Sequence, residues 1–224
     1  EDLRHYFPDL NTQVKIIPLG SDHLLPLADA GQEADDLRPY FLSVGTREPR
    51  KNRLGLLKAF EAVAAEADAL ELVVVGRPGW MDNAFDEALA VSPVRDRVRM
   101  LEGVDDRELA AFYTNAVALV YPSLGEGFGL PVTEAMALGC PVITSDVTSL
   151  PQVAGGAAML VNPSEVPSLA DAMRKMASDP ALRRSYAMAG KKRAAALTWK
   201  GAAADTLNLF RTLTGLADRN RGKS

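Results

Sequence analysis

Two glutamates, Glu126 and Glu134, bracket a glycine-rich stretch, GEGFGLPVTE, at residues 125–134. Glycines let a ligand approach the backbone closely, and Pro131 suits the first turn of a helix because its φ is fixed and it lacks an N–H group. The free amides of such a helix start attract an anion. Two carboxylates beside one anion site indicate a ligand that carries both phosphate and hydroxyl groups, such as a phosphate-bearing sugar.

A structural explanation of the same residues has to be weighed. Glycines near a strand end often form only a tight turn, and glutamates at a helix start often serve only the helix dipole. The two glutamates at this spacing, directly after the apolar run at residues 116–121, favour the binding interpretation.

A second group of candidate residues is basic. Arg47, Arg50 and Lys51 lie within residues 46–52, again directly after an apolar run. Three cations can neutralise a diphosphate, with the guanidinium groups gripping two oxygens and the ammonium acting as a point charge. Surface cations before a helix are also common, so this group indicates a diphosphate site mainly through its expected place beside the glycine-rich stretch.

Other residues carry weaker indications. Val104 follows a glycine after a third apolar run, where exposed backbone could contact a nucleotide base. Cys140 is expected to be a small buried side chain and not a nucleophile. The two histidines, His5 and His23, have no cluster of ligand-type residues nearby, so we expect no metal site.

The composition limits the class of protein. A chain of 224 residues with 47% hydrophobic and 24% charged residues suits one large globular domain or two small ones. Its net charge of −4 argues against general nucleic-acid binding. One cysteine fits a reducing compartment, and we find neither a secretory signal nor an apolar run long enough to span a bilayer. We therefore expect a cytoplasmic protein, and because the chain begins with Glu1 we expect its natural N-terminus to lie upstream.

Apolar runs alternate with helical patterns through the middle of the chain. Strands are predicted at residues 40–45, 71–76, 97–101, 116–121, 141–144 and 157–161, and helices at 53–67, 84–90, 106–114, 131–138, 169–177, 181–195 and 200–216. This alternation predicts an α/β fold with a doubly wound parallel sheet of about six strands and extra C-terminal helices. Ligands of such sheets bind outside the carboxyl ends of the strands, which is where the candidate residues fall.

The two ends of the chain look different from this middle. Residues 1–38 hold one strand-like run, 14–18, and are expected to be a linker or remnant of a preceding domain. Residues 39–200 are expected to form the ligand-binding domain, and residues 201–224 a C-terminal helix and tail. In that helix Leu207, Phe210, Leu213 and Leu216 form an apolar stripe at helical spacing.

The motifs resemble the donor-binding half of a retaining family-4 glycosyltransferase, an enzyme built of two Rossmann-like domains in the GT-B architecture. The matching segments are residues 44–52, 72–80, 119–134 and 149–156, and the resemblance covers the chain from about residue 40 to 200. The resemblance implies that Glu126 binds hydroxyls of the donor sugar and Glu134 those of the ribose. Lys51 and a neighbouring arginine would hold the diphosphate. That arginine is expected to be Arg50, since Thr46 stands where many relatives carry the arginine.

The expected site residues can be given together. The catalytic group would comprise Glu126, Lys51 and Arg50. The residues expected to bind the donor are Glu134, Gly127, Phe128, Gly129, Leu130, Gly45, Thr46, Arg47 and Val104. No cofactor or metal is expected, because cations and helix amides suit a leaving diphosphate and no Asp-x-Asp triplet is present.

The resemblance also implies a reaction and its partners. A hexose would pass, with retention at the anomeric carbon, from a nucleotide diphosphate sugar to an acceptor hydroxyl. Residues 48–52 resemble mannosyl-transferring relatives and favour GDP-mannose, with a UDP-hexose second. The acceptor would be a sugar, a lipid-linked precursor or a polysaccharide, bound through an N-terminal domain that this chain lacks. A peripheral membrane association of the full-length protein and its oligomeric state stay open.

Three alternatives remain. Another GT-B enzyme, a nucleotide-sugar epimerase or a phosphorylase, would share the fold. A catalytically silent nucleotide-binding or interaction module would keep the fold and lose the chemistry. A dinucleotide-dependent dehydrogenase is disfavoured, because no Gly-x-Gly-x-x-Gly follows the first predicted strand of the sheet.

Overall fold

The computed structural model describes residues 2–30, 38–77, 79 and 83–214. Glu1, residues 31–37, residues 78 and 80–82, and residues 215–224 with Leu216 lie outside these ranges.

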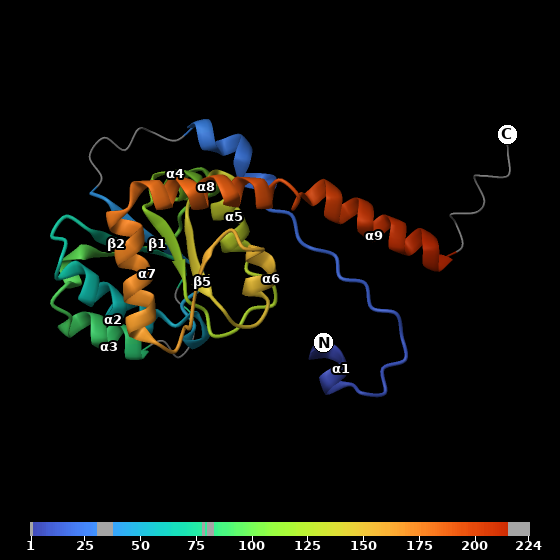
Figure 1. Ribbon diagram of the computed structural model, residues 1–224, viewed down its shortest axis with the longest axis horizontal. Helices are drawn as coiled ribbons and strands as arrows, with labels where there is room; N and C mark the ends of the chain where they lie inside the picture. Colours follow the sequence, from blue (N-terminus) through green and yellow to red (C-terminus); the bar gives the residue numbers. More distant parts are fainter. Residues whose placement is uncertain (1, 31–37, 78, 80–82, 215–224) are drawn as a thin grey trace.

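The described chain is built on one six-stranded parallel sheet (Figure 1). Its strands are β1 (Tyr40–Val44), β2 (Glu71–Val75), β3 (Val98–Leu101), β4 (Ala118–Tyr121), β5 (Val142–Ser145) and β6 (Met159–Val161). They lie in the order β3-β2-β1-β4-β5-β6, with Phe41 of β1 aligned to Leu72 of β2 on one side and to Ala118 of β4 on the other. All six predicted strands are confirmed, and the doubly wound α/β class with them.

The strand order reverses between β1 and β4. The chain winds outward from β1 to β3 and then returns to place β4 on the other side of β1. In sheets of this kind the loops after the two central strands separate to opposite faces, which leaves a crevice for a ligand at the carboxyl ends. The loops after β1 and β4 hold the two groups of residues that the sequence indicated.

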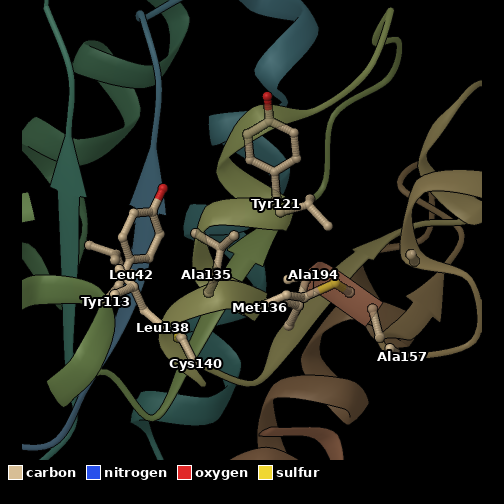
Figure 2. Close-up of a cluster of buried hydrophobic side chains, with 14 of the residues drawn as sticks. Leu42, Tyr113, Tyr121, Ala135, Met136, Leu138, Cys140, Ala157 and Ala194 are labelled. Atoms are coloured by element: carbon tan, nitrogen blue, oxygen red, sulfur yellow. The ribbon is translucent and has the colours of Figure 1, made fainter. Parts of the chain in front are cut away.

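Helices cover both faces of the sheet. On one face α4 (Asp106–Asn115), α5 (Leu130–Leu138), α6 (Leu150–Ala154) and α8 (Pro180–Ala194) close a core, and on the other α2 (Arg53–Ala64), α3 (Asn83–Val91) and α7 (Val166–Ser178) do so. Figure 2 shows the first core, where Met136 of α5 and Ala194 of α8 lie beside each other and Tyr113 of α4 packs near Leu42 of β1. Cys140 is buried in the same cluster, as expected.

The N-terminal stretch differs from the expectation in two ways. No strand forms at residues 14–18; the stretch instead holds a short helix, α1 (Asp2–Tyr6), and a 3-10 segment, η1 (Asp22–Ala30). The segment η1 packs on α4 and α5, and Leu24 within it is fully buried in the core. The division at residue 38 stays a prediction, but packing places part of the expected linker within the domain.

The C-terminal helix α9 (Trp199–Thr214) extends away from the domain (Figure 1). Leu207, Phe210 and Leu213 are 49%, 59% and 70% exposed. The predicted apolar stripe is therefore present on α9 and uncovered over its described residues. None of the described helices is long and apolar enough to cross a membrane.

Candidate functional site

The loop after β1 supplies the cations. It passes from Gly45, at φ +135°, into a 3-10 turn, η2 (Pro49–Lys51), and then directly into α2. Asn52 stands between the turn and the helix in a left-handed conformation, and its side chain donates to the carbonyl of Pro163 (2.7 Å). Asn52 is the N-cap residue of α2, but its side chain makes no capping hydrogen bond to that helix. The contact instead fixes the loop against the segment after β6, with Arg50 and Lys51 at its end.

The loop after β4 supplies the carboxylate and the start of α5. Gly129 occupies the N-cap at φ +96°, a left-handed conformation that favours glycine, and Pro131 lies in the first turn. The loop is held from the segment before α6. The Ser149 hydroxyl donates to the carbonyl of Glu126 (2.9 Å), and the Thr148 hydroxyl accepts from the Glu126 amide (3.2 Å). The predicted entry into the helix is thus confirmed, and the backbone around Glu126 is fixed on both sides.

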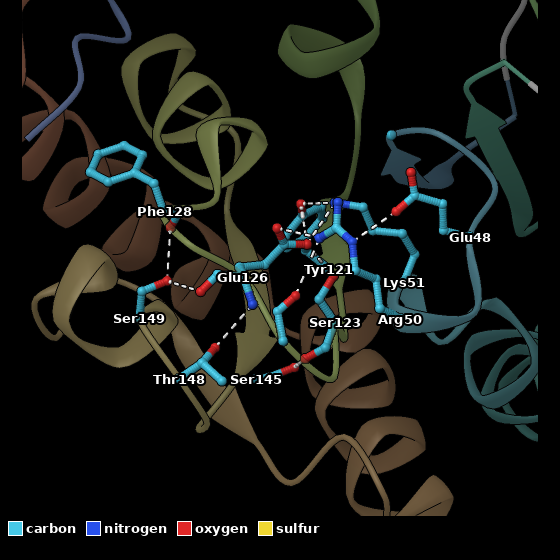
Figure 3. A network of polar contacts seen from close by, with 12 residues as sticks. Glu48, Arg50, Lys51, Tyr121, Ser123, Glu126, Phe128, Ser145, Thr148 and Ser149 are labelled. Carbon is cyan, nitrogen blue, oxygen red and sulfur yellow. Dashed lines mark hydrogen bonds and ion pairs between the residues drawn. The ribbon is translucent and has the colours of Figure 1, made fainter. Parts of the chain in front are cut away.

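The side chain of Glu126 is the centre of the polar cluster drawn in Figure 3. Its Oε1 accepts from Lys51 Nζ (2.6 Å), from the Tyr121 hydroxyl (2.8 Å) and from the Ser123 hydroxyl (2.8 Å). Its Oε2 pairs with Arg50 Nη1 at 2.6 Å. The Tyr121 hydroxyl also accepts from Lys51 Nζ at 2.5 Å, so tyrosine, lysine and glutamate contact one another.

These contacts shift the ionisation of the cluster. Burial alone would raise the pKa of Glu126, but hydrogen bonds from Lys51, Ser123 and Tyr121 outweigh it and bring the pKa below its ordinary value. Burial lowers the pKa of Lys51 even though Glu126 opposes that shift. A carboxylate and a partly desolvated ammonium thus lie side by side, as suits a site that handles anions and hydroxyls.

Glu134 lies in a different environment. It is buried, its Oε2 accepts from the Tyr113 hydroxyl (2.9 Å), and its Oε1 lies 3.4 Å from His23 Nε2 of η1. Burial raises the pKa of Glu134, against the opposing effects of Tyr113 and His23. The two glutamates of the motif therefore have different partners, Glu126 from the loop after β4 and Glu134 from within α5.

Two pockets open at the carboxyl ends of the central strands, and both include Gly45 and Thr46. The first, of about 310 Å³, lies over the start of α5. Its lining comprises Leu19, Gly45, Thr46, Arg50, Lys51, Tyr121, Glu126, Phe128, Gly129, Leu130 and Pro131. The second, of about 410 Å³, is lined by residues at or just after the ends of β1, β2 and β3, and it includes Val104.

Most of the predicted site residues meet at these pockets. Three do not line either one: Arg47, Glu134 and Gly127. Arg47 pairs with Asp86 of α3 (2.8 Å), so the structure ties this cation to a neighbouring helix and away from Lys51. Gly127 is exposed on the loop.

Sequence reasoning did not single out Tyr121 and Ser123 as site residues. Both hydroxyls contact Glu126, and Tyr121 also lines the first pocket. The available signal was their position, because they directly precede the glycine-rich stretch at the end of a predicted strand. Among the described residues no three His, Cys, Asp or Glu side chains are grouped so as to share a metal ion.

Fold and site together define a doubly wound α/β domain with a cationic pocket at its switch point. The chain belongs to the family described as glycosyl transferases group 1, whose model matches residues 28–193. Among curated relatives, the O-antigen chain mannosyltransferase B of Escherichia coli is 34% identical over 198 residues, which cover 88% of this chain and 51% of that protein. The MMP alpha-(1->4)-mannosyltransferase of Mycolicibacterium hassiacum is 31% identical, with 88% and 48% covered. The chain thus spans about half the length of these two relatives.

Solved structures agree on the fold. Sucrose-phosphate synthase from Thermosynechococcus elongatus matches with a TM-score of 0.80 at 28% identity, over 96% of this chain and 57% of that one. The C-terminal domain of a glycosyl transferase group 1 family protein from Francisella tularensis matches with a TM-score of 0.64 at 20% identity, over 80% of this chain and 94% of that domain. The fold expected from the sequence, one half of a GT-B architecture, is confirmed.

Proposed function

We propose that the whole protein is a retaining family-4 glycosyltransferase and that this chain is its donor-binding half. It would transfer a hexose from a nucleotide diphosphate sugar to an acceptor hydroxyl. The observation that carries the proposal is the first pocket, where Lys51 and Arg50 meet Glu126 beside the start of α5. That set of groups matches a ligand with a diphosphate and a hydroxyl-rich ring.

The chemistry follows from the charges. Breaking the bond to the anomeric carbon leaves negative charge on the diphosphate, and the reaction is fast only where that charge is stabilised. Lys51 and Arg50 supply positive charge, and the positive end of the α5 dipole adds to it. In this proposal neither a metal nor a cofactor is required. Glu126 would bind sugar hydroxyls, while Val104 and the second pocket would take the base.

The nucleotide sugar is proposed to be GDP-mannose, with a UDP-hexose as the second candidate. Support comes from the names of the relatives, since two matching over most of this chain are called mannosyltransferases. The acceptor would be a sugar, a lipid-linked precursor or a polysaccharide, because one of these relatives is named for the O-antigen chain. We place the protein in the cytoplasm, with peripheral association to the inner face of the membrane where the acceptor is lipid-linked.

Glu134 is proposed to bind ribose hydroxyls despite its present partners. Its neighbour His23 lies between Glu134 and the solvent, with a side chain that is 38% exposed. A ribose can therefore reach Glu134 if His23 moves aside. A crystal of the chain with GDP tests this directly: we expect a hydrogen bond from a ribose hydroxyl to Glu134. A ribose bound elsewhere, with Glu134 still on Tyr113, would remove the role.

The central test is Glu126→Ala in the full-length parent protein. We expect turnover with the donor sugar to fall by about 100-fold or more, since a group that acts on the reacting sugar is lost. Glu66→Gln is the matched control, because Glu66 is exposed and pairs with Arg174 on the surface. Nuclear magnetic resonance of the product checks retention at the anomeric carbon. Full turnover by the Glu126→Ala enzyme would contradict the proposal.

The alternatives give different products. An epimerase would change or hydrolyse the donor without an acceptor, and a phosphorylase would need free phosphate and release a sugar phosphate. A silent module would bind GDP or UDP and turn over nothing, whichever residue is replaced. Measuring the products of the parent protein with donor alone, with donor and phosphate, and with donor and acceptor separates all four.

The isolated chain is expected to bind nucleotide but to transfer sugar poorly or not at all. In the proposed enzyme the final helix would cross back to the N-terminal domain, and the exposed stripe on α9 fits that arrangement. Titration of the 224-residue chain with GDP, UDP and ADP should show binding and identify the base. Turnover by this chain at the rate of the longer parent would contradict the expectation.

A further inference from the structure

Both oxygens of the Glu126 carboxylate already have partners in the present arrangement. Three donors contact Oε1, and Arg50 takes Oε2. Only 8% of the Glu126 side chain is exposed. A sugar hydroxyl that reaches this buried carboxylate therefore competes with partners that are already in place.

Both cations of the pocket already have partners as well. Lys51 Nζ lies between Glu126 and Tyr121, and Arg50 pairs with Glu126 through Nη1 and with Glu48 through Nε (2.7 Å). The positive charges of the pocket are thus matched by two carboxylates. An incoming diphosphate therefore meets cations that already hold carboxylates, and it competes with those carboxylates for the positive charge.

We propose that donor binding is an exchange of partners at Glu126, in which the diphosphate takes Lys51 and Arg50 while Tyr121 and Ser123 keep the carboxylate in place for the sugar. The inference rests on the function proposed above and adds Tyr121 and Ser123 to it as positioning residues. Each step replaces one ion pair by another, and no covalent bond changes.

The geometry favours this division of partners. Tyr121 at the end of β4 and Ser123 two residues after it are both buried, so their hydroxyls are held beside Glu126. Lys51 and Arg50 come from the opposite loop on long side chains, and Arg50 is exposed. Rotation about the bonds of these side chains can therefore bring the cations to a diphosphate over α5, while the two hydroxyls stay with Glu126. After the exchange two hydroxyl donors still hold Oε1, and Oε2 faces the pocket for the sugar.

The exchange predicts an unusual sign for one variant. With GDP or UDP as the probe and no sugar present, Glu126→Gln should bind about threefold to tenfold more tightly than the unaltered chain, because a neutral amide no longer competes for the cations. Binding is measured by titration calorimetry on the 224-residue chain, with Glu66→Gln as control. Weaker binding by Glu126→Gln would overturn the inference, since it would mean that Glu126 only orients the cations.

Simple charge repulsion between Glu126 and the diphosphate would also give tighter binding, and a double-mutant cycle separates the two. If binding is an exchange, the gain in nucleotide affinity from Glu126→Gln shrinks when Lys51 is replaced by Met, because Glu126 then holds one cation fewer. Under repulsion alone the gain stays or grows, since Lys51 no longer screens Glu126. If Lys51→Met binds too weakly to measure, the same cycle with Arg50→Met decides between the two.

Tyr121→Phe tests the positioning role. We expect the extra affinity that the matching sugar adds over GDP or UDP alone to fall by a larger factor than the affinity for the nucleotide itself, since the carboxylate is less well held. A purely structural role would lower both affinities together with the melting temperature. Equal loss of both would overturn the role of Tyr121.

The outcomes also separate this inference from the proposed function. If the unaltered chain binds none of GDP, UDP or their sugars, the proposed function fails. If it binds them and Glu126→Gln binds less tightly, the exchange fails while the function stands.

Discussion

Glu126 and Glu134 show how one residue type takes two states within a single motif. Hydrogen bonds to Lys51, Ser123 and Tyr121 outweigh burial at Glu126 and lower its pKa, whereas burial prevails at Glu134 and raises its pKa. Their opposite shifts have opposite consequences for stability, because a group affects the free energy of unfolding only where its protonation differs between the folded and unfolded chains.

The first prediction compares Glu126→Gln and Glu134→Gln across pH. The stabilisation by Glu126 is present above its ordinary pKa of 4.5 and is lost as pH falls through the lower folded value. The folded chain favours the protonated form of Glu134. The stabilisation that Glu134 provides is therefore present below pH 4.5 and declines as pH rises through its higher pKa in the folded chain.

Urea denaturation between about pH 3.5 and 7 measures both effects. The stability advantage of the unaltered chain over Glu126→Gln should narrow toward acid. Its advantage over Glu134→Gln should narrow toward neutral pH. Two differences that change with pH in the same direction would show that the environments of the two glutamates are not as described.

At the scale of elements, the start of α5 depends on a backbone conformation. Gly129 stands at φ +96°, and a Cβ there would lie 2.7 Å from Leu150 Cδ2 of α6. Gly127, two residues earlier, has no positive φ and no atom within 4 Å of the corresponding Cβ position. The turn into the helix therefore requires glycine at position 129, whereas the backbone at position 127 does not.

The second prediction uses these glycines as a matched pair. Gly129→Ala should lower the free energy of unfolding by roughly 1–3 kcal/mol, from left-handed strain and the displaced Leu150. Gly127→Ala should change it by less than about 0.5 kcal/mol. Chemical denaturation gives both values, and an equal loss in the two variants would contradict the account of the helix start.

At the scale of the whole molecule, hydrogen bonds join two segments that are far apart in the chain. The backbone amide of Ser21 donates to the carbonyl of Leu197 (3.0 Å), and the Trp199 amide donates to Asp22 (2.8 Å). The stretch that enters the domain and the stretch that leaves it toward α9 therefore lie together. Leu24 fastens this junction to the core next to α4 and α5.

The third prediction concerns that junction. Leu24→Ala should cost about 2–5 kcal/mol in the free energy of unfolding, because a fully buried leucine leaves a cavity. Leu25→Ala, at a neighbouring position that is 45% exposed, should stay within about 0.5 kcal/mol. A negligible effect of Leu24→Ala in thermal or urea unfolding would show that η1 is a linker after all.

Local sequence patterns were sufficient to predict the sheet and the place of the candidate site. Strands buried on both faces consist of continuous apolar residues, and the turn after β4 needs glycine and proline at fixed positions, so both leave a local signal. The sheet class, its six strands, the start of α5 and the positions of Lys51, Arg50 and Glu126 in one pocket followed from such signals.

Only the tertiary structure decided which partner each side chain takes. Arg47 and Arg50 are the same residue type in the same loop, yet Arg47 pairs with Asp86 and Arg50 with Glu126. The inclusion of Leu24 in the core and the contacts of Tyr121 and Ser123 with Glu126 were equally hidden. The physical reason is that ion pairs and hydrogen bonds form over a few ångströms between residues distant in sequence, so they depend on how the loops are packed and not on local pattern.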